Sequence, residues 1–163
     1  MGMFSSKKDV AITIRCAVIE DVPAIIEMGT KFYAASKWAD VIAGFDPGSF
    51  EVTVQRMIVP ESGGLILLAM AGDQPAGMAG VLIYPCFFNL QILFAQEVFY
   101  WVEPQHRGHG GPVLLDGLEV VCKGLGANVM ILAATSGLRD KALAELYARR
   151  GYRAGENSFV KAL

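Results

Sequence analysis

The sequence has few residues that could form disulfides or bind a metal ion. It contains three cysteines and two histidines in 163 residues. Cys16, Cys86 and Cys122 are widely spaced and form no CxxC pair. This odd, dispersed set predicts free core thiols in a reducing, cytoplasmic compartment and argues against a zinc site. His106 and His109 have no nearby array of cysteines or carboxylates, so no metal is expected.

An excess of positive charge is also absent. The formal net charge is −2 and the isoelectric point is about 5.7, which leaves no electrostatic footprint for nucleic acid. Residues 74–96 contain no charged side chain, and a span of this length could cross a bilayer. Prolines, glycines and amides interrupt it, so we expect two buried strands and no membrane partner. The span is more apolar than a small monomer usually needs, which makes a homodimer a hypothesis.

The N-terminus lacks the apolar stretch of a secretory signal peptide, because it is polar after Phe4. Its first residues, MGMFSS, fit the loose N-myristoylation pattern, although a flexible leader is the simpler interpretation. We expect residues 1–8 to be disordered. Residues 9–163 should form one domain, because no repeat or low-complexity linker divides them and their number suffices for a core.

Strand-like and helix-like patterns succeed one another along the chain. They predict strands over 11–17, 65–71, 76–84, 94–102, 128–134 and 158–163, and helices over 22–35, 50–59, 111–125 and 139–150. Asp21 and Ser49 are the expected N-caps of the first two helices, and Gly72-Asp73 marks a hairpin turn. The unit at 94–134 predicts a right-handed crossover between parallel strands, in an α/β fold.

The most informative stretch is a glycine turn between a predicted strand and a predicted helix. It contains Arg107, Gly108, Gly110 and Gly111. A helix N-terminus exposes unpaired N–H groups, glycines let a ligand approach, and arginine suits phosphate oxygens. A tight turn with a positive φ needs one glycine, so three favour a phosphate ligand. The Walker A and dinucleotide patterns both fail, because the required lysine is missing and Val113 stands at the third glycine position.

The glycine turn resembles the pyrophosphate loop of the GNAT superfamily of N-acetyltransferases. The family signature has glutamine or arginine, then glycine three positions later and a small residue two further on. The six residues QHRGHG, from Gln105 to Gly110, fit it. The frame from Arg107 fits only as far as Gly110, because Pro112 stands where glycine or alanine is usual. We expect this proline to remove one N–H from the phosphate cradle.

Three other segments carry the same resemblance. Residues 14–32 are similar to the family's first strand and helix, residues 64–81 to its central hairpin, and residues 146–153, LYARRGYR, to its late helix with the ending LYxxxGF. The whole pattern is most similar to small phage- or prophage-type members. The resemblance implies a mixed, mostly antiparallel central sheet flanked by helices, with the parallel unit at 94–134.

The resemblance also implies acetyl-coenzyme A as co-substrate and direct attack of a primary amine on its thioester. The residues expected to bind the co-substrate are Tyr100, Trp101, Val102, Arg107, Gly108, His109, Gly110 and Gly111. A non-catalytic acyl-coenzyme A-binding module is the alternative. The apolar composition alone supports a third class, a scaffold protein.

An amine with a pKa of about 10 must lose a proton before it attacks. Glu97 is the predicted base, because strand alternation places it on an apolar face, where a carboxylate pKa rises. That face is expected to contain Leu93, Ala95, Phe99 and Trp101. The alternatives are an edge carboxylate that faces solvent or pairs with an arginine, and a water relay between base and amine. Glu103, in the turn, is a second candidate base.

The departing thiolate benefits from a proton, and the resemblance implies Tyr147 as the acid. The alternative is packing, because Tyr147 forms a helical stripe with Leu143 and Leu146. Tyr152 is expected to be a packing residue.

The acceptor groove implied by the fold lies between residues 33–50 and 85–91. Its candidate residues are Trp38, Phe45, Phe87 and Phe88, with Asp40 and Asp46 as partners for a cationic amine. This leaves open whether the acceptor is a small amine, an antibiotic, a peptide or a protein terminus.

Overall fold

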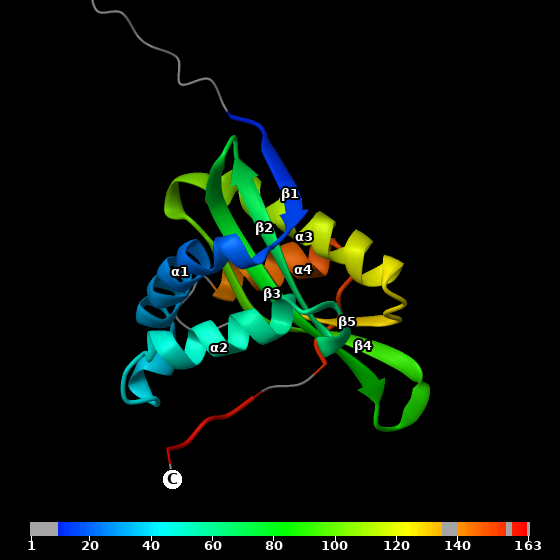
Figure 1. Cartoon of the computed structure of the whole chain (residues 1–163). Coiled ribbons are helices and arrows are strands. Elements are labelled where there is room, and N and C mark those ends of the chain that lie inside the picture. Colours follow the sequence, from blue (N-terminus) through cyan, green and yellow to red (C-terminus); the bar gives the residue numbers. More distant parts are fainter. Residues whose placement is uncertain (1–9, 135–139, 156–157, 163) are drawn as a thin grey trace, which may run out of the picture.

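The computed structural model of the chain describes residues 10–134, 140–155 and 158–162. Its sheet has the strand order β1-β2-β3-β4-β5 (Figure 1). The strands are β1 (Ile12–Cys16), β2 (Gly64–Ala71), β3 (Gln74–Cys86), β4 (Asn89–Val102) and β5 (Val129–Ile131). Neighbours among the first four pair antiparallel, and β5 lies parallel to β4. The predicted mixed, mostly antiparallel sheet with a parallel unit is therefore confirmed.

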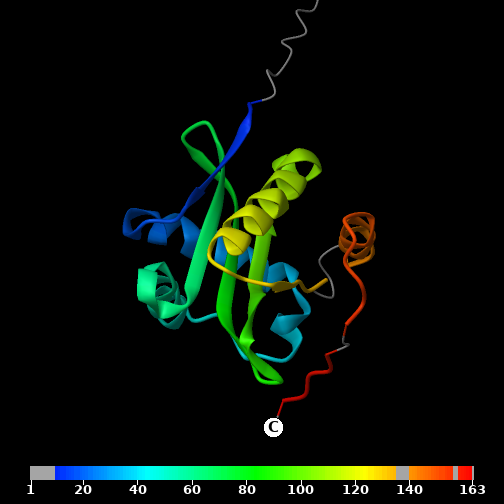
Figure 2. The same ribbon diagram turned by 90° about the vertical axis from the view of Figure 1, so that its right-hand side faces the viewer.

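Helices cover both faces of this sheet. They are α1 (Val22–Ala35), α2 (Pro47–Ile58), α3 (Arg107–Gly124) and α4 (Asp140–Arg149). Helices α1 and α2 pack on one face, and α3 lies on the other face with α4 beyond it (Figure 2). Within the described ranges, no helix combines the length and the hydropathy needed to cross a membrane.

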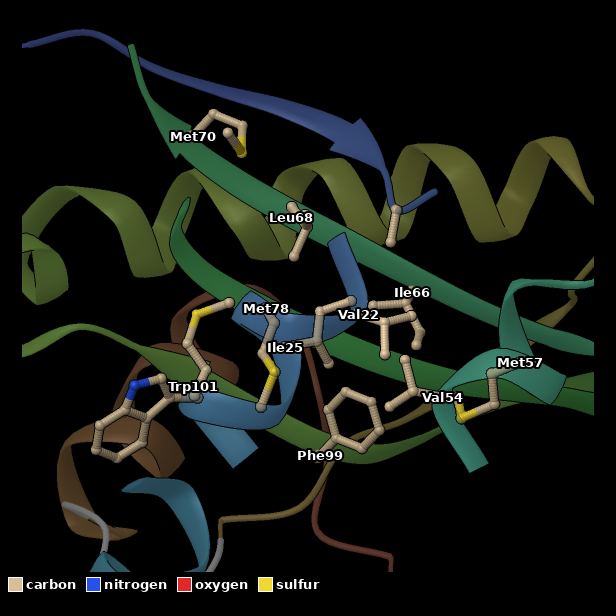
Figure 3. Packing of buried hydrophobic residues seen from close by; sticks show 12 residues of the cluster. Val22, Ile25, Val54, Met57, Ile66, Leu68, Met70, Met78, Phe99 and Trp101 are labelled. Carbon is tan, nitrogen blue, oxygen red and sulfur yellow. The ribbon is translucent and has the colours of Figure 1, made fainter. Parts of the chain in front are cut away.

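Two clusters of buried apolar side chains, one on each face, hold the helices to the sheet. The cluster under α1 and α2 joins Ile25 and Val54 to residues of β2, β3 and β4 (Figure 3). In this cluster Phe99 packs so closely on Gly80 that a Cβ there would lie 2.3 Å from its ring. The cluster under α3 is built around Leu114. Each fully buried aliphatic side chain of this kind stabilises the fold by roughly 1.5–3 kcal/mol.

Helix α2 starts earlier than the sequence predicted. It begins at Pro47, and the Asp46 carboxylate accepts the N–H groups of Gly48 and Ser49 at 3.2 and 3.3 Å. Asp46 is therefore the N-cap, and the prediction that Ser49 caps the helix is wrong. The physical reason is that proline suits the first helical position and aspartate the position before it.

Asp21 precedes α1 but does not cap it through its side chain. Its carboxylate accepts the Val18 N–H at 2.8 Å and two bonds from the Arg15 guanidinium at 2.6 and 2.7 Å. The Arg15 guanidinium lowers the pKa of Asp21. Asp21 therefore fixes the turn between β1 and α1 instead of the helix terminus.

The β3–β4 hairpin is longer than predicted. Strand β4 begins at Asn89, and Phe87 and Phe88 form the turn. Most of the predicted loop 85–91 therefore lies at the paired ends of two strands, because the pairing continues to the tip of the hairpin. The two phenylalanines are 75% and 86% exposed, and their ring centroids are 4.2 Å apart.

The strand predicted over 158–163 is absent from the described part of that segment. Residues 158–162 form no strand, and their side chains are exposed. Strand β5 is three residues long, and in the described structure it pairs with β4 alone. Residues with strand propensity form a strand only where a neighbouring edge and a packing surface are available, which explains why this prediction is wrong.

The three cysteines do not share one environment. Cys86 and Cys122 are buried, as predicted, and burial raises the pKa of the Cys122 thiol to about 11. Cys16 is exposed, so the prediction of a core thiol is wrong there. It ends β1, an outer strand of the sheet, where fewer neighbours cover a side chain.

Candidate active site

A pocket of about 260 Å³ lies between the end of β4, the start of α3 and one side of α4. Its lining residues are Tyr100, Trp101, Val102, Arg107, Gly108, Gly111, Pro112, Ala133, Ala142, Leu143, Leu146 and Arg149. The structure thus brings six of the eight residues predicted to bind a co-substrate to one pocket. His109 and Gly110 belong to the same helical turn but do not line it. Side chains from β4, α3 and α4 meet there because the crossover places α3 beside the end of β4.

The glycine turn is the first part of α3, which begins at Arg107 and not at Gly111. Gly108, Gly110 and Gly111 have no positive φ, so the turn does not need glycine for its backbone conformation. These glycines matter because they have no side chain, which leaves space around the backbone. A Cβ at Gly108 would have no atom within 4 Å, whereas one at Gly110 would lie 3.3 Å from Val102 Cγ1. Gly108 therefore leaves open space, and Gly110 allows close packing on β4.

This helix start corrects the prediction for Pro112. Since α3 begins at Arg107, the N–H groups without a partner inside the helix are those of its first turn. Pro112 lies in the second turn. The donor it lacks belongs to the hydrogen-bond ladder of the helix, and the first-turn donors are all retained.

Two side chains fix the start of α3 against β4. The Tyr100 hydroxyl donates to the Gly111 carbonyl at 2.6 Å. The Arg107 Nε donates to the Val102 carbonyl at 3.0 Å, and its guanidinium lies 4.8 Å from the centroid of the Trp101 ring. A cation over an indole ring is favourable, so Trp101 helps to orient the arginine. The end of β4 and the glycine turn are therefore held in one arrangement.

Glu97 is buried on the α3 side of the sheet. It is 7% exposed, and its Oε2 accepts the Ala133 N–H at 3.1 Å. Burial raises its pKa from 4.5 to about 7, while the bond from Ala133 acts in the opposite direction. Desolvation dominates because one neutral donor stabilises the anion less than water would. Glu97 is therefore not the solvent-facing edge carboxylate of the alternative interpretation.

The face on which Glu97 lies differs in part from the prediction. Phe99 pairs with Gly80 and Glu97 with Val81, so Val98 is an extra residue without a partner. This bulge interrupts the alternation. Ala95 and Glu97 share the α3 side, whereas Phe99 and Trp101 belong to the cluster under α1 and α2. The prediction that all of them share one face is wrong.

Tyr147 lies close to Glu97 through a shared residue. Its hydroxyl donates to the Ala133 carbonyl at 3.4 Å, a long bond, while the Ala133 N–H donates to Glu97. Burial raises the Tyr147 pKa, and the negative charge of Glu97 raises it further. Tyr147 therefore keeps its proton at neutral pH. It is also packed against Tyr152, with ring centroids 5.7 Å apart.

Glu103, the second candidate base, and Tyr152, the expected packing residue, both have structural partners. Glu103 accepts a hydrogen bond from Lys31 Nζ at 2.8 Å, which links α1 to the segment before the glycine turn. This ion pair occupies the carboxylate, and Glu103 does not line the pocket. The Tyr152 hydroxyl donates to Glu119 at 2.8 Å, so Tyr152 joins α3 to the segment after α4.

The predicted acceptor residues do not line this pocket, and both acids have other partners. Asp46 caps α2, and Asp40 lies 3.6 Å from Lys37 Nζ. Phe45 packs between the rings of Tyr33 and Phe50, at 5.7 and 5.4 Å. Trp38 is 39% exposed. Phe45 is thus a packing residue of the α1–α2 connection.

Sequence reasoning missed the wall that α4 contributes. Ala142, Leu146 and Arg149 follow the i, i+4, i+7 spacing of one helix stripe, and all three line the pocket. The sequence pattern assigned Leu146 to a core stripe with Leu143 and Tyr147, so a pocket wall was not predicted there. No group of three or more cysteine, histidine, aspartate or glutamate residues in the described structure could hold a metal ion.

The chain was compared with family models, curated proteins and solved structures. Residues 32–152 match the model of the acetyltransferase (GNAT) family. No curated protein matched the chain in a sequence comparison. A predicted acetyltransferase from Clostridium acetobutylicum, solved with acetyl-CoA, has a TM-score of 0.70 and 15% identity over 92% of this chain and 95% of that chain.

Two further solved structures have the same fold. An aminoglycoside acetyltransferase from an uncultured soil metagenomic sample, in complex with trehalose, has a TM-score of 0.71 and 15% identity, over 93% of this chain and 96% of that chain. Ribosomal-protein-alanine N-acetyltransferase from Brucella melitensis biovar Abortus 2308 has a TM-score of 0.71 and 16% identity, over 94% of this chain and 99% of that chain. At such identities the likeness concerns the fold, and the family model identifies the relationship. The chain belongs to the acetyltransferase (GNAT) family.

Proposed function

We propose that the protein transfers the acetyl group of acetyl-coenzyme A to a primary amine by direct attack. The observation that carries this proposal is the buried Glu97 carboxylate, which accepts a hydrogen bond from Ala133 in the wall of the pocket at the start of α3. Burial raises the pKa of this carboxylate to about 7. Ala133, which lines the pocket, bonds to both Glu97 and Tyr147. Glu97 and Tyr147 do not line the pocket themselves, but both contact this lining residue, which supports a candidate base and a candidate acid behind one wall of the pocket.

The residues at the pocket suit acetyl-coenzyme A. The first-turn N–H groups of α3, the positive end of its dipole and Arg107 would hold the pyrophosphate, and Gly108 leaves room for it. Leu143 and Leu146 would contact the apolar part of the pantetheine arm. The bound thioester supplies the activated acetyl group. The Clostridium acetobutylicum neighbour solved with acetyl-CoA supports this choice of co-substrate.

The proton transfers follow from the pKa values. Glu97, directly or through a water, takes a proton from the amine, and its raised pKa makes it a stronger base than an exposed glutamate. The amine nitrogen bonds to the acetyl carbon, and the carbon–sulfur bond breaks. Tyr147 gives its proton to the departing thiolate, and the second proton that the nitrogen loses as the amide forms returns through solvent to the Tyr147 phenolate. Its long bond to the Ala133 carbonyl holds the hydroxyl weakly, which leaves it able to turn toward sulfur.

A non-catalytic binding module is disfavoured by Glu97 itself. A buried carboxylate with one hydrogen bond costs stability when it ionises, and a module that only binds coenzyme A has no use for it. The acceptor is a small-molecule or peptide amine, in keeping with the aminoglycoside and ribosomal-protein acceptors in the names of two neighbours. The buried thiols of Cys86 and Cys122 suit a reducing, cytoplasmic setting.

The test is a panel of amines with acetyl-coenzyme A, scored by release of free thiol. The panel contains amino sugars, polyamines, aromatic amines and peptides with a free N-terminus, and Glu97→Gln serves as the control. We expect at least one amine to release thiol with the wild type at a rate 10²–10⁴ times that of the variant, roughly the contribution of a general base. Binding of acetyl-coenzyme A without turnover of any amine would instead support the binding module.

A further inference from the structure

The pocket contains two arginines and no acidic residue. Arg107 comes from the glycine turn and Arg149 from α4. Neither forms an ion pair with a residue in the described ranges. A pocket with two uncompensated guanidinium groups and the positive end of a helix dipole attracts a ligand with more than one negative charge.

Arg149 differs in this respect from its neighbour in the sequence. Arg150 forms an ion pair with Asp116 of α3, which raises the Arg150 pKa. Arg149 lies one position away on the helix, on the stripe with Ala142 and Leu146 that faces the pocket. The pair between Arg150 and Asp116 joins α4 to α3. It leaves the stripe that carries Arg149 turned toward the pocket.

We infer that Arg149 binds a phosphate group of acyl-coenzyme A from α4, as a second cation beside Arg107. The inference rests on the proposed function, because it concerns the same pocket. Arginine presents a fork of donors that matches phosphate oxygens, and its charge persists at every working pH. Coenzyme A carries phosphate at two places, the pyrophosphate and the 3′-phosphate, and either would serve as the partner.

The test compares coenzyme A, dephospho-coenzyme A and pantetheine by calorimetric titration against three proteins. These are the wild type, Arg149→Met, which keeps an apolar stem, and Arg153→Met, a matched change at an exposed arginine after α4. We expect Arg149→Met to raise the Kd for coenzyme A about tenfold, because a charge-assisted contact is lost from a partly screened site. Its Kd for pantetheine should equal that of the wild type, and Arg153→Met should change neither.

Dephospho-coenzyme A identifies the phosphate. If the effect disappears with this ligand, the partner is the 3′-phosphate, and if it remains, the partner is the pyrophosphate. If Arg149→Met and Arg153→Met have the same Kd for coenzyme A, the inference is overturned, while the proposed function stays intact. An equal loss of affinity for pantetheine would also overturn it, because it would show a packing role. Failure of the wild type to bind coenzyme A would overturn the proposed function itself.

Discussion

Glu97 should make the protein less stable as the pH rises. Burial raises its pKa from 4.5 to about 7 in the folded protein, so the folded state binds a proton more tightly than the unfolded chain. The free energy of unfolding therefore falls as the pH rises from about 4.5 through 7, and the loss is complete above the folded pKa. A shift of this size corresponds to about 3 kcal/mol.

Replacement of Glu97 by glutamine removes this titration and keeps the shape of the side chain. We expect the stability of Glu97→Gln relative to the wild type to increase between pH 5 and pH 8.5, by up to ~3 kcal/mol. The same variant should lose ~10²–10⁴-fold in kcat/KM at pH 8. The wild-type rate should increase as the pH rises through about 7, and this increase should be absent from the variant. Stability and activity would thus move in opposite directions at one residue.

Urea unfolding at several pH values measures the first effect and thiol release the second. Glu145→Gln, on an exposed position of α4, is the matched control and should leave both curves unchanged. Wild-type and Glu97→Gln stabilities that differ by a constant amount from pH 5 to 8.5 would refute a desolvated Glu97. A wild-type pH–rate profile retained in the variant would refute its role as the base.

Three further predictions concern the acid, the glycine turn and the assembly. Tyr147→Phe keeps the ring packed on Tyr152, so we expect kcat to fall roughly 10²-fold with an unchanged Kd for acetyl-coenzyme A; turnover near the wild-type rate would show a packing role. Gly108→Ala should keep or slightly raise the Tm, because a Cβ there meets no atom within 4 Å. It should also reduce the Tm gain from acetyl-coenzyme A, which the control Gly124→Ala, equally open in α3, should not do. The uncharged span at 74–96 predicts a homodimer. A monomer mass from light scattering at high protein concentration would refute this prediction.

Most of the fold followed from local patterns in the sequence. The hairpin at Gly72-Asp73 and the helices were predictable, because each depends on residues close to one another in the chain. The parallel pairing of β4 with β5 was predictable from the strand–helix–strand order. The C-terminal strand was not, since Phe159 and Val160 are residue types that favour strands but have no paired edge in the described structure. The pocket wall from α4 was missed for a related reason. A helix stripe such as that of Leu146 and Arg149 shows periodicity, while the surface it faces depends on tertiary packing.

The bulge at Val98 is the feature on which both the core and the site depend. With strict alternation, Glu97 and Phe99 would share a face, so either a carboxylate would enter the cluster under α1 and α2 or a phenylalanine would leave it. The extra residue lets Phe99 pack on Gly80 while Glu97 lies beside Ala133. Glu97 is thereby separated from that core by the sheet and faces the side where the pocket forms. An apolar residue such as Val98 carries no sign of this in the sequence, because a bulge is defined by pairing with the neighbouring strand.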